Sequence, residues 1–129
     1  MGRCLPGHDD WHFCSSTPYE HCATCCREVN SFRAKTKNAR VRSETLDVYG
    51  RFCACCGENT EVFLCIDHVD GGGDAHRREI GTHGIYWWLK RNNWPSGFQT
   101  LCHNCNYAKH ALGICPHQEG LNSAAAACA

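Results

Sequence analysis

Two pairs of cysteines, each spaced to hold a metal ion, are the clearest chemical feature of the sequence. Cys53 and Cys56 form one CxxC pair, and Cys102 and Cys105 form a second. Two such pairs can supply four thiolates to a tetrahedral Zn²⁺, because a tight turn lets the two sulfurs of each pair converge on one ion. We therefore predict a structural zinc site, with buried free cysteines as the alternative. Cys55 is a spare thiol that could replace a neighbour as ligand, although the spacing favours Cys53.

Other cysteines and histidines could form further sites. A third CxxC pair, Cys22 and Cys25, predicts a second zinc near the N-terminus. Its remaining ligands are ambiguous among Cys4, Cys14, His8 and His12, and we choose the two cysteines. Near the other end, Cys115 and His117 could close a further site or simply pack nearby, and we do not predict them as ligands.

An Asp-His dipeptide lies between the two main CxxC pairs. Asp67 and His68 end a stretch rich in Val, Phe and Ile, and a run of three glycines, residues 71–73, follows. Adjacent side chains of a strand point to opposite sides, so one of the two can bind a metal while the other faces elsewhere. The dipeptide alone is a weak signal, and its placement between the two CxxC pairs makes it specific.

Composition limits the class of protein. The chain has 129 residues, 13 Cys, nine His and equal numbers of acidic and basic residues, 13 of each. It is therefore one small domain or two very small ones, built with the help of metal or cross-links. No stretch approaches the roughly 18 apolar residues of a membrane span. The N-terminal sequence also lacks the apolar region of a secretory signal, so we expect a cytoplasmic, non-secreted protein in which zinc is favoured over disulfides.

The elements that must position these residues follow from the local sequence. Residues 1–26 predict a Cys/His-rich zinc knuckle, residues 27–49 a basic, exposed helix, residues 50–117 the main core, and residues 118–129 a disordered tail. Within the core we expect a strand over 61–69, a loop at the glycines, a helix over 84–93 and a strand over 98–101. A last helix should begin at Asn104 or Asn106, with Asn104 as a candidate cap, and end near residue 111.

The motifs CxxCG, FLCIDHVDGGG and LCHNCNYAK together resemble the HNH endonuclease superfamily over residues 51–117. The pattern is closest to the phage recombination endonuclease VII type, with Asn106 where many HNH enzymes have His. The resemblance implies a small α+β, zinc-stabilised fold, with a ββα-metal (treble-clef) core preceded by the zinc knuckle and the basic helix. An Asn that usually precedes the second CxxC has no counterpart here.

The resemblance also implies a role for each residue. Asp67 and Asn106 would bind one catalytic Mg²⁺ or Mn²⁺, and His68 would be the general base that activates water for attack on a phosphodiester of DNA. The expected function is thus a metal-dependent DNA endonuclease. The alternative is a non-catalytic, zinc-dependent module that binds nucleic acid. A zinc-built protein-interaction domain of RING type is weaker, because RING ligands interleave in eight positions.

DNA is the expected partner, and the sequence leaves open whether the protein acts as a homodimer. His76 could be a third metal ligand or a solvated loop residue. Trp87, Trp88 and Trp94 are more typical of a small core than of stacking on bases.

The residues that we predict to contact DNA are basic and lie either near the glycine run, in the last helix or in the basic helix: Arg77, Arg78, Lys109, Arg33, Lys35, Lys37, Arg40 and Arg42.

Overall fold

The computed structural model describes residues 11–13, 20–81 and 84–118. The chain divides into two compact units, Met1–Arg40 and Val41–Ala129, and each is described by itself. Helix α1 (Ala23–Tyr49) begins in the first unit and ends in the second. Among the described residues, no helix combines the length and apolar character needed to span a membrane.

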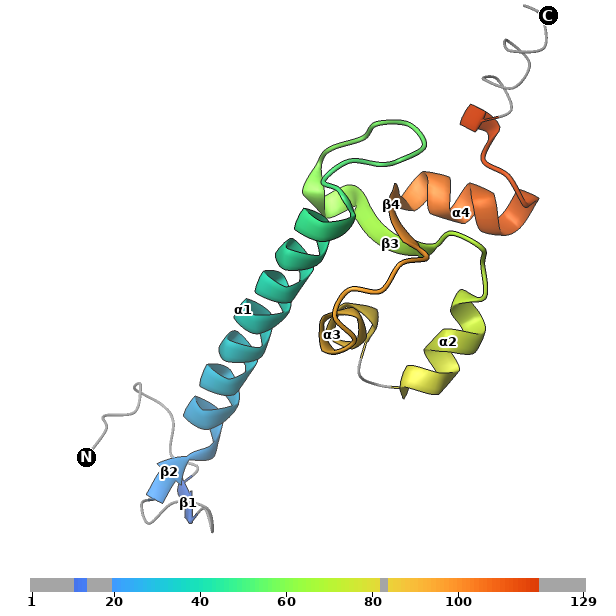
Figure 1. Ribbon diagram of the computed structural model, residues 1–129. Coiled ribbons are helices and arrows are strands. Elements are labelled where there is room, and N and C mark those ends of the chain that lie inside the picture. The colour runs from blue at the N-terminus through green and yellow to red at the C-terminus, as the bar shows by residue number, and fades with distance from the viewer. Residues whose placement is uncertain (1–10, 14–19, 82–83, 119–129) are drawn as a thin grey trace, which may run out of the picture. The chain divides into compact units, whose positions relative to one another are not determined.

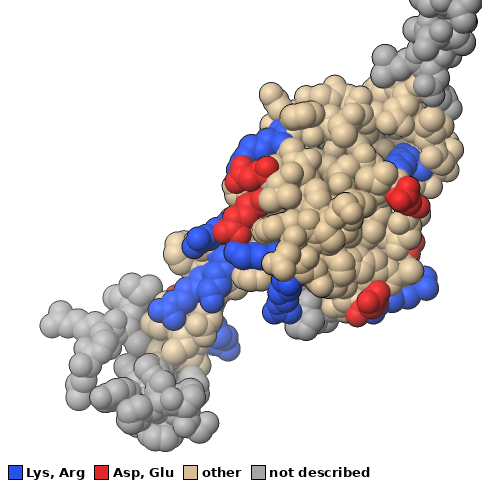
Figure 2. Space-filling view, viewed as in Figure 1, with Lys and Arg blue, Asp and Glu red and all other residues tan. Residues whose placement is uncertain are grey.

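The first unit contains a short hairpin and most of α1. Strand β1 (Trp11–Phe13) pairs antiparallel with β2 (Glu20–Cys22), and α1 follows β2 directly (Figure 1). The helix has no Gly or Pro, and every residue from 27 to 40 is exposed. Lys and Arg side chains gather along α1 in Figure 2. This part of α1 therefore has the solvated, basic character expected from the sequence.

The second unit is built on a two-stranded antiparallel sheet with a helix packed against it. Strand β3 (Leu64–His68) pairs with β4 (Phe98–Cys102), so that Leu64 lies opposite Cys102 and His68 lies opposite Phe98. Helix α4 (His103–Leu112) follows β4 without a loop and packs against both strands (Figure 1). The arrangement is a small α+β fold.

Sulfur makes up much of the core of the second unit. Four of the seven residues in its buried cluster are cysteines, and the others are leucines: Cys53, Cys102, Cys105, Cys115, Leu46, Leu64 and Leu101. A core this small buries little apolar surface, so a metal bound by these cysteines would add to the stability of the unit.

Two short helices fill the connection between β3 and β4. Helix α2 (Gly73–Ile80) follows the glycine turn, where the sequence predicted a loop at the glycines and no helix. Gly71 and Gly72 do break the backbone, with φ of 79° and 82°, but the break only ends the turn after β3. The polar residues that follow are adequate helix formers, so the helix begins at the third glycine. Helix α3 (Ile85–Arg91) is one or two residues shorter at each end than expected.

Two other boundaries differ from those expected. Residues Glu61–Phe63 form a turn of 3-10 helix (η1), so strand β3 begins at Leu64 and not at residue 61. Helix α4 begins at His103, and its N-cap is Cys102 instead of Asn104, because the Cys102 Sγ accepts a hydrogen bond from the Cys105 N–H at 3.4 Å.

Arg42 ties the end of α1 to the sheet. Its guanidinium donates to the hydroxyl of Tyr86 at 3.0 Å, and to the carbonyl oxygens of Glu61 at 2.5 Å and Leu64 at 2.7 Å. The sequence predicts Arg42 as a DNA contact. Both terminal nitrogens of its guanidinium donate within the fold, so this side chain also helps to position β3.

Candidate functional site

The four predicted zinc ligands lie together at one end of the sheet. Cys53 and Cys56 lie in the turn after α1, and Cys102 and Cys105 join β4 to α4. Their ligand atoms all lie within 4.8 Å of one another, and we call them the first thiol cluster. The Sγ atoms of Cys56 and Cys102 are 3.7 Å apart. A tetrahedron with Zn–S bonds of about 2.3 Å has edges of about 3.8 Å, so the cluster fits Zn²⁺.

The turn that carries Cys53 and Cys56 is held by its backbone. Gly57 N–H donates to the Cys53 carbonyl at 2.9 Å, with a positive φ of 79° at Gly57 that favours glycine. Burial raises the pKa of Cys53, but hydrogen bonds from the backbone at residues 56, 102 and 55 outweigh it and lower this pKa to about 7. Burial raises the pKa of Cys105 in the same cluster, so of these two sulfurs only Cys53 is in surroundings that favour the thiolate.

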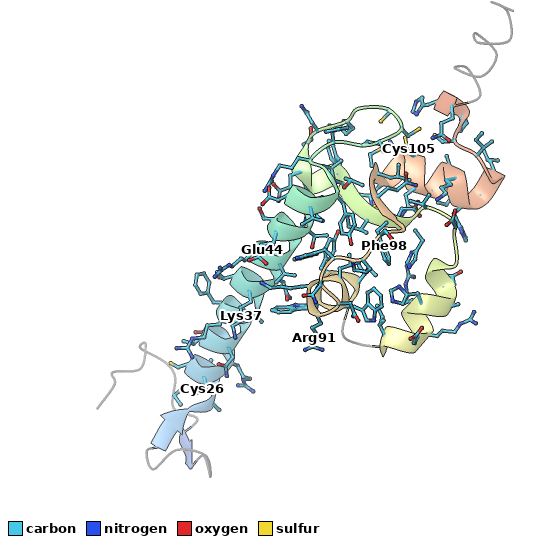
Figure 3. The ribbon with its side chains drawn as sticks, viewed as in Figure 1. Cys26, Lys37, Glu44, Arg91, Phe98 and Cys105 are labelled. Carbon is cyan, nitrogen blue, oxygen red and sulfur yellow. The ribbon has the colours of Figure 1, made fainter. Side chains whose placement is uncertain are left out.

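A cleft of about 1070 Å³ lies at the other end of β3. It is bordered by the end of β3, the glycine turn, α2 and α4, and its lining includes Asp67, His68 and Asn106. Figure 3 labels Cys105, which belongs to the first thiol cluster, and Phe98, which begins β4 and pairs with His68. The three residues that the sequence predicts as catalytic therefore share one concave surface.

Asp67 faces α4. Lys109 donates from Nζ to Asp67 Oδ2 at 2.6 Å, and Gln99 donates to the same oxygen at 2.9 Å. Asn106, one turn earlier on α4, donates from Nδ2 to the Cys65 sulfur at 3.4 Å. Residues 65 and 67 lie on the same side of the strand, so Asn106 and Lys109 both approach the face that carries the carboxylate.

His68 faces the opposite way, towards α2 and α3. Its Nε2 lies 2.7 Å from His76 Nδ1, and its ring packs on Phe98 with the ring centres 4.7 Å apart. A Cβ at Gly73 would lie 3.2 Å from His68 Nδ1, so the glycine leaves that nitrogen its space. Burial lowers the pKa of His68, and the nearby His76 and Lys109 lower it further against the opposing effect of Asp67. These surroundings therefore favour the neutral form of the imidazole.

His76 is a functional candidate that the sequence left undecided. It lies on α2, half-buried against Trp88 with ring centres 4.2 Å apart, and not in a solvated loop. Its Nε2 is buried, and the described residues offer that atom no hydrogen-bond partner. His76 contacts His68 from a separate helix, and only the fold brings the two rings together.

The predicted DNA-contacting residues fall in different places. Arg77 is exposed and lines the cleft, and Arg78 is exposed on the same helix. Lys109 lines the cleft but is bound to Asp67 and to the carbonyl oxygens of His68 and Val69. Besides Arg42, four more, all exposed, lie on the part of α1 that belongs to the first unit: Arg33, Lys35, Lys37 and Arg40.

The N-terminal zinc site stays a prediction. Cys4, Cys14 and His8 lie outside the described residues, as does the side chain of His12. Cys22 ends β2 and is buried, and Cys25 lies half-buried in the first turn of α1.

A second group of ligands forms beside the first thiol cluster. Cys55, Cys105, Cys115 and His117 also place their ligand atoms within 4.8 Å of one another. The sequence named Cys55 only as a spare thiol and did not predict Cys115 or His117 as ligands. A CPH tripeptide shortly after the second CxxC was the only available signal, and it does not say which sulfurs it approaches.

Comparisons with protein-family models, curated proteins and solved structures found no match to this chain.

Proposed function

We propose that the protein is a metal-dependent DNA endonuclease of the HNH type, which hydrolyses phosphodiester bonds. The observation that carries the proposal is the shared cleft: Asp67, His68 and Asn106, from two separate elements, all line it. The order β3, β4, α4, with the first thiol cluster at the β4–α4 junction, is consistent with the ββα-metal core that the sequence motifs imply.

His68 is the proposed general base. Its Nε2 is engaged with His76, so Nδ1, beside Gly73, is the nitrogen left to accept a proton from water. His76 is a positioning residue in this scheme, because it holds the ring of His68 and not the substrate. A general base must be unprotonated at the working pH, and the lowered pKa of His68 favours the unprotonated ring.

Asp67 and Asn106 are the proposed ligands of a divalent cation. A carboxylate and an amide oxygen suit Mg²⁺ or Mn²⁺, and a bound cation would offset the negative charge that develops on the phosphate. Lys109 already places a positive charge on Asp67 Oδ2. The cation must therefore compete with this ammonium group for the carboxylate, and Lys109, once released, can contact phosphate.

Exposed basic residues supply the proposed contacts with the DNA backbone. Arg77 at the cleft and the lysines and arginines of α1 carry the charge that phosphate attracts. Each phosphate contact releases counterions, so binding should weaken steeply as salt rises.

Cleavage of supercoiled plasmid DNA with Mg²⁺ or Mn²⁺ tests the proposal. We expect the wild-type protein to cut and His68→Ala to cut at least about 100-fold more slowly, since a general base typically contributes 10²–10⁴-fold. Asn59→Ala, an exposed change outside the cleft, is the control and should cut normally. Undiminished cleavage by His68→Ala would eliminate His68 as the base.

The second candidate is a non-catalytic, zinc-dependent module that binds nucleic acid. It is favoured by one observation: the carboxylate of Asp67 is ion-paired with Lys109. This candidate predicts salt-dependent DNA binding by the wild-type protein with no metal-dependent cleavage. Gel-shift and plasmid assays on the same sample separate the two.

A further inference from the structure

Cys105 belongs to both groups of metal-ligating side chains. Its Sγ lies within 4.8 Å of the other three sulfurs of the first thiol cluster, and equally within 4.8 Å of the ligand atoms of Cys55, Cys115 and His117. We infer that the two groups bind two Zn²⁺ ions as one binuclear centre, bridged by the Cys105 thiolate. This inference does not depend on the proposed nuclease activity.

The distances in the second group match a tetrahedral zinc site. His117 Nδ1 lies 3.3 Å from Cys105 Sγ and 3.5 Å from Cys115 Sγ. With bonds of about 2.3 Å to sulfur and about 2.0–2.1 Å to nitrogen, the S···N edge of a zinc tetrahedron is about 3.6 Å. Three thiols and one imidazole are also a standard ligand set for structural zinc.

The fold presents these four ligands from three separate segments. Cys55 lies in the same turn as Cys53 and Cys56 but belongs to the second group, and Cys105 lies in the first turn of α4. Cys115 follows the end of α4 and is only 4% exposed, and a hydrogen bond of 2.8 Å from Gln118 N–H to the Cys115 carbonyl shapes the turn that carries His117. A metal here would fasten the segment after α4 to the turn after α1.

Counting ligands shows why the sulfur must be shared. The two groups contain seven different residues, whereas two four-coordinate ions need eight ligand positions. A bridging Cys105 fills the eighth position. As the centre forms, six thiols release their protons to solvent, eight metal–ligand bonds form, and no oxidation state changes. Six thiolates, a neutral imidazole and two Zn²⁺ ions leave a net charge of −2.

The zinc content of the full-length protein tests the second site. We expect the double variant Cys115→Ser/His117→Ala to hold one zinc per chain fewer than the wild type, measured by mass spectrometry of the metal after exhaustive dialysis. Cys65→Ser is the matched control, because this thiol belongs to neither group, and it should keep the wild-type zinc content. Any zinc at the N-terminal cysteines is the same in all three proteins and cancels in the comparison. Equal zinc content in the double variant and the wild type would overturn the second site.

The bridge itself is tested in the wild-type protein, so the result does not depend on whether a variant folds. Zn²⁺ is replaced by ¹¹³Cd²⁺, and correlations between cysteine β protons and cadmium are recorded by NMR. The β protons of Cys105 should correlate with two distinct cadmium signals, and those of Cys53 and Cys115 with one each. Correlation of Cys105 with a single cadmium would refute a shared thiolate, because Cys105 would then bind one ion in only one of the two groups.

Discussion

Replacing Lys109 by Met tests whether Asp67 is available to a divalent cation. The Nζ of Lys109 donates to three oxygens, at 2.6 Å to Asp67 Oδ2, 2.6 Å to the His68 carbonyl and 2.9 Å to the Val69 carbonyl. The two side chains of the ion pair are 25% and 14% exposed. Met is one atom shorter than Lys, so it keeps the unbranched apolar part of the side chain and removes the ammonium group with its donors.

Two opposing effects follow from this change. A hydrogen bond to a charged group contributes about 1.5–3 kcal/mol, and Gln99 still supports Asp67, so the metal-free variant should lose about 2 kcal/mol of unfolding free energy. That loss corresponds to roughly 10 °C in melting temperature for a unit of this size. In the wild type, a cation must displace the ammonium at a similar cost. Since about 1.4 kcal/mol is a factor of ten, the variant should bind Mn²⁺ about 30-fold more tightly.

Thermal unfolding across a Mn²⁺ titration measures both effects, with zinc retained in every sample. A ligand at 100 times its Kd raises the unfolding free energy by about 2.7 kcal/mol. The unfolding free energy of Lys109→Met should therefore begin to rise at lower Mn²⁺ concentrations than that of the wild type. Lys90→Met is the control, because Lys90 pairs with Glu44 outside the cleft and both side chains are more exposed. It should change stability by less than about 1 kcal/mol and respond to Mn²⁺ like the wild type. Equal Mn²⁺ responses of Lys109→Met and the wild type would refute competition at Asp67.

Three further predictions concern His68, the residue beside it and Arg42. Because burial and His76 lower the pKa of His68, its ring stays neutral to lower pH than a free imidazole. The acid limb of the kcat/KM profile should therefore have its midpoint below pH 6.5. A midpoint above pH 6.5 would contradict the assignment of His68 as the general base. Gly73→Ala should slow plasmid cleavage, because a Cβ at residue 73 would lie 3.2 Å from His68 Nδ1 and crowd that nitrogen. A folded variant with unchanged cleavage would remove Nδ1 from the mechanism. Arg42→Lys keeps the charge but cannot reproduce the three hydrogen bonds, so chemical denaturation should show a loss of about 2 kcal/mol in unfolding free energy. The control Arg33→Lys, at an exposed position, should show no loss. Equal stabilities of the two variants would contradict the structural role of Arg42.

Local spacing explains what the sequence could predict. The convergence of Cys53 with Cys56, and of Cys102 with Cys105, follows from turns of a few residues, so it can be read directly from CxxC. The basic part of α1 could be predicted because a long stretch without Gly or Pro carries charges all round. The strand ending in Asp67 and His68 was also expected, with its start misplaced by the η1 turn.

Contacts between distant elements explain what the sequence could not predict. The pairing of His68 with His76 depends on α2, which the glycine run concealed, and the pairing of Asp67 with Lys109 depends on the register between β3 and α4. The second ligand group depends on how the chain turns back after α4, which no residue spacing encodes. In each case the residues were visible in the sequence, but the partner was set by tertiary packing.

The thiol cluster and the cleft are coupled through α4. Cys105 lies among the metal-ligating sulfurs, and Asn106, the next residue, lines the cleft about 100° further round the helix. Cys102 caps the same helix and pairs with Leu64, four residues before His68 on β3. An ion held by Cys102 and Cys105 therefore sets the rotation of α4, and with it the directions of Asn106 and Lys109, relative to the strand that carries Asp67 and His68. Because so little apolar surface supports this junction, a metal bound at the thiols would be the strongest restraint on the geometry of the cleft.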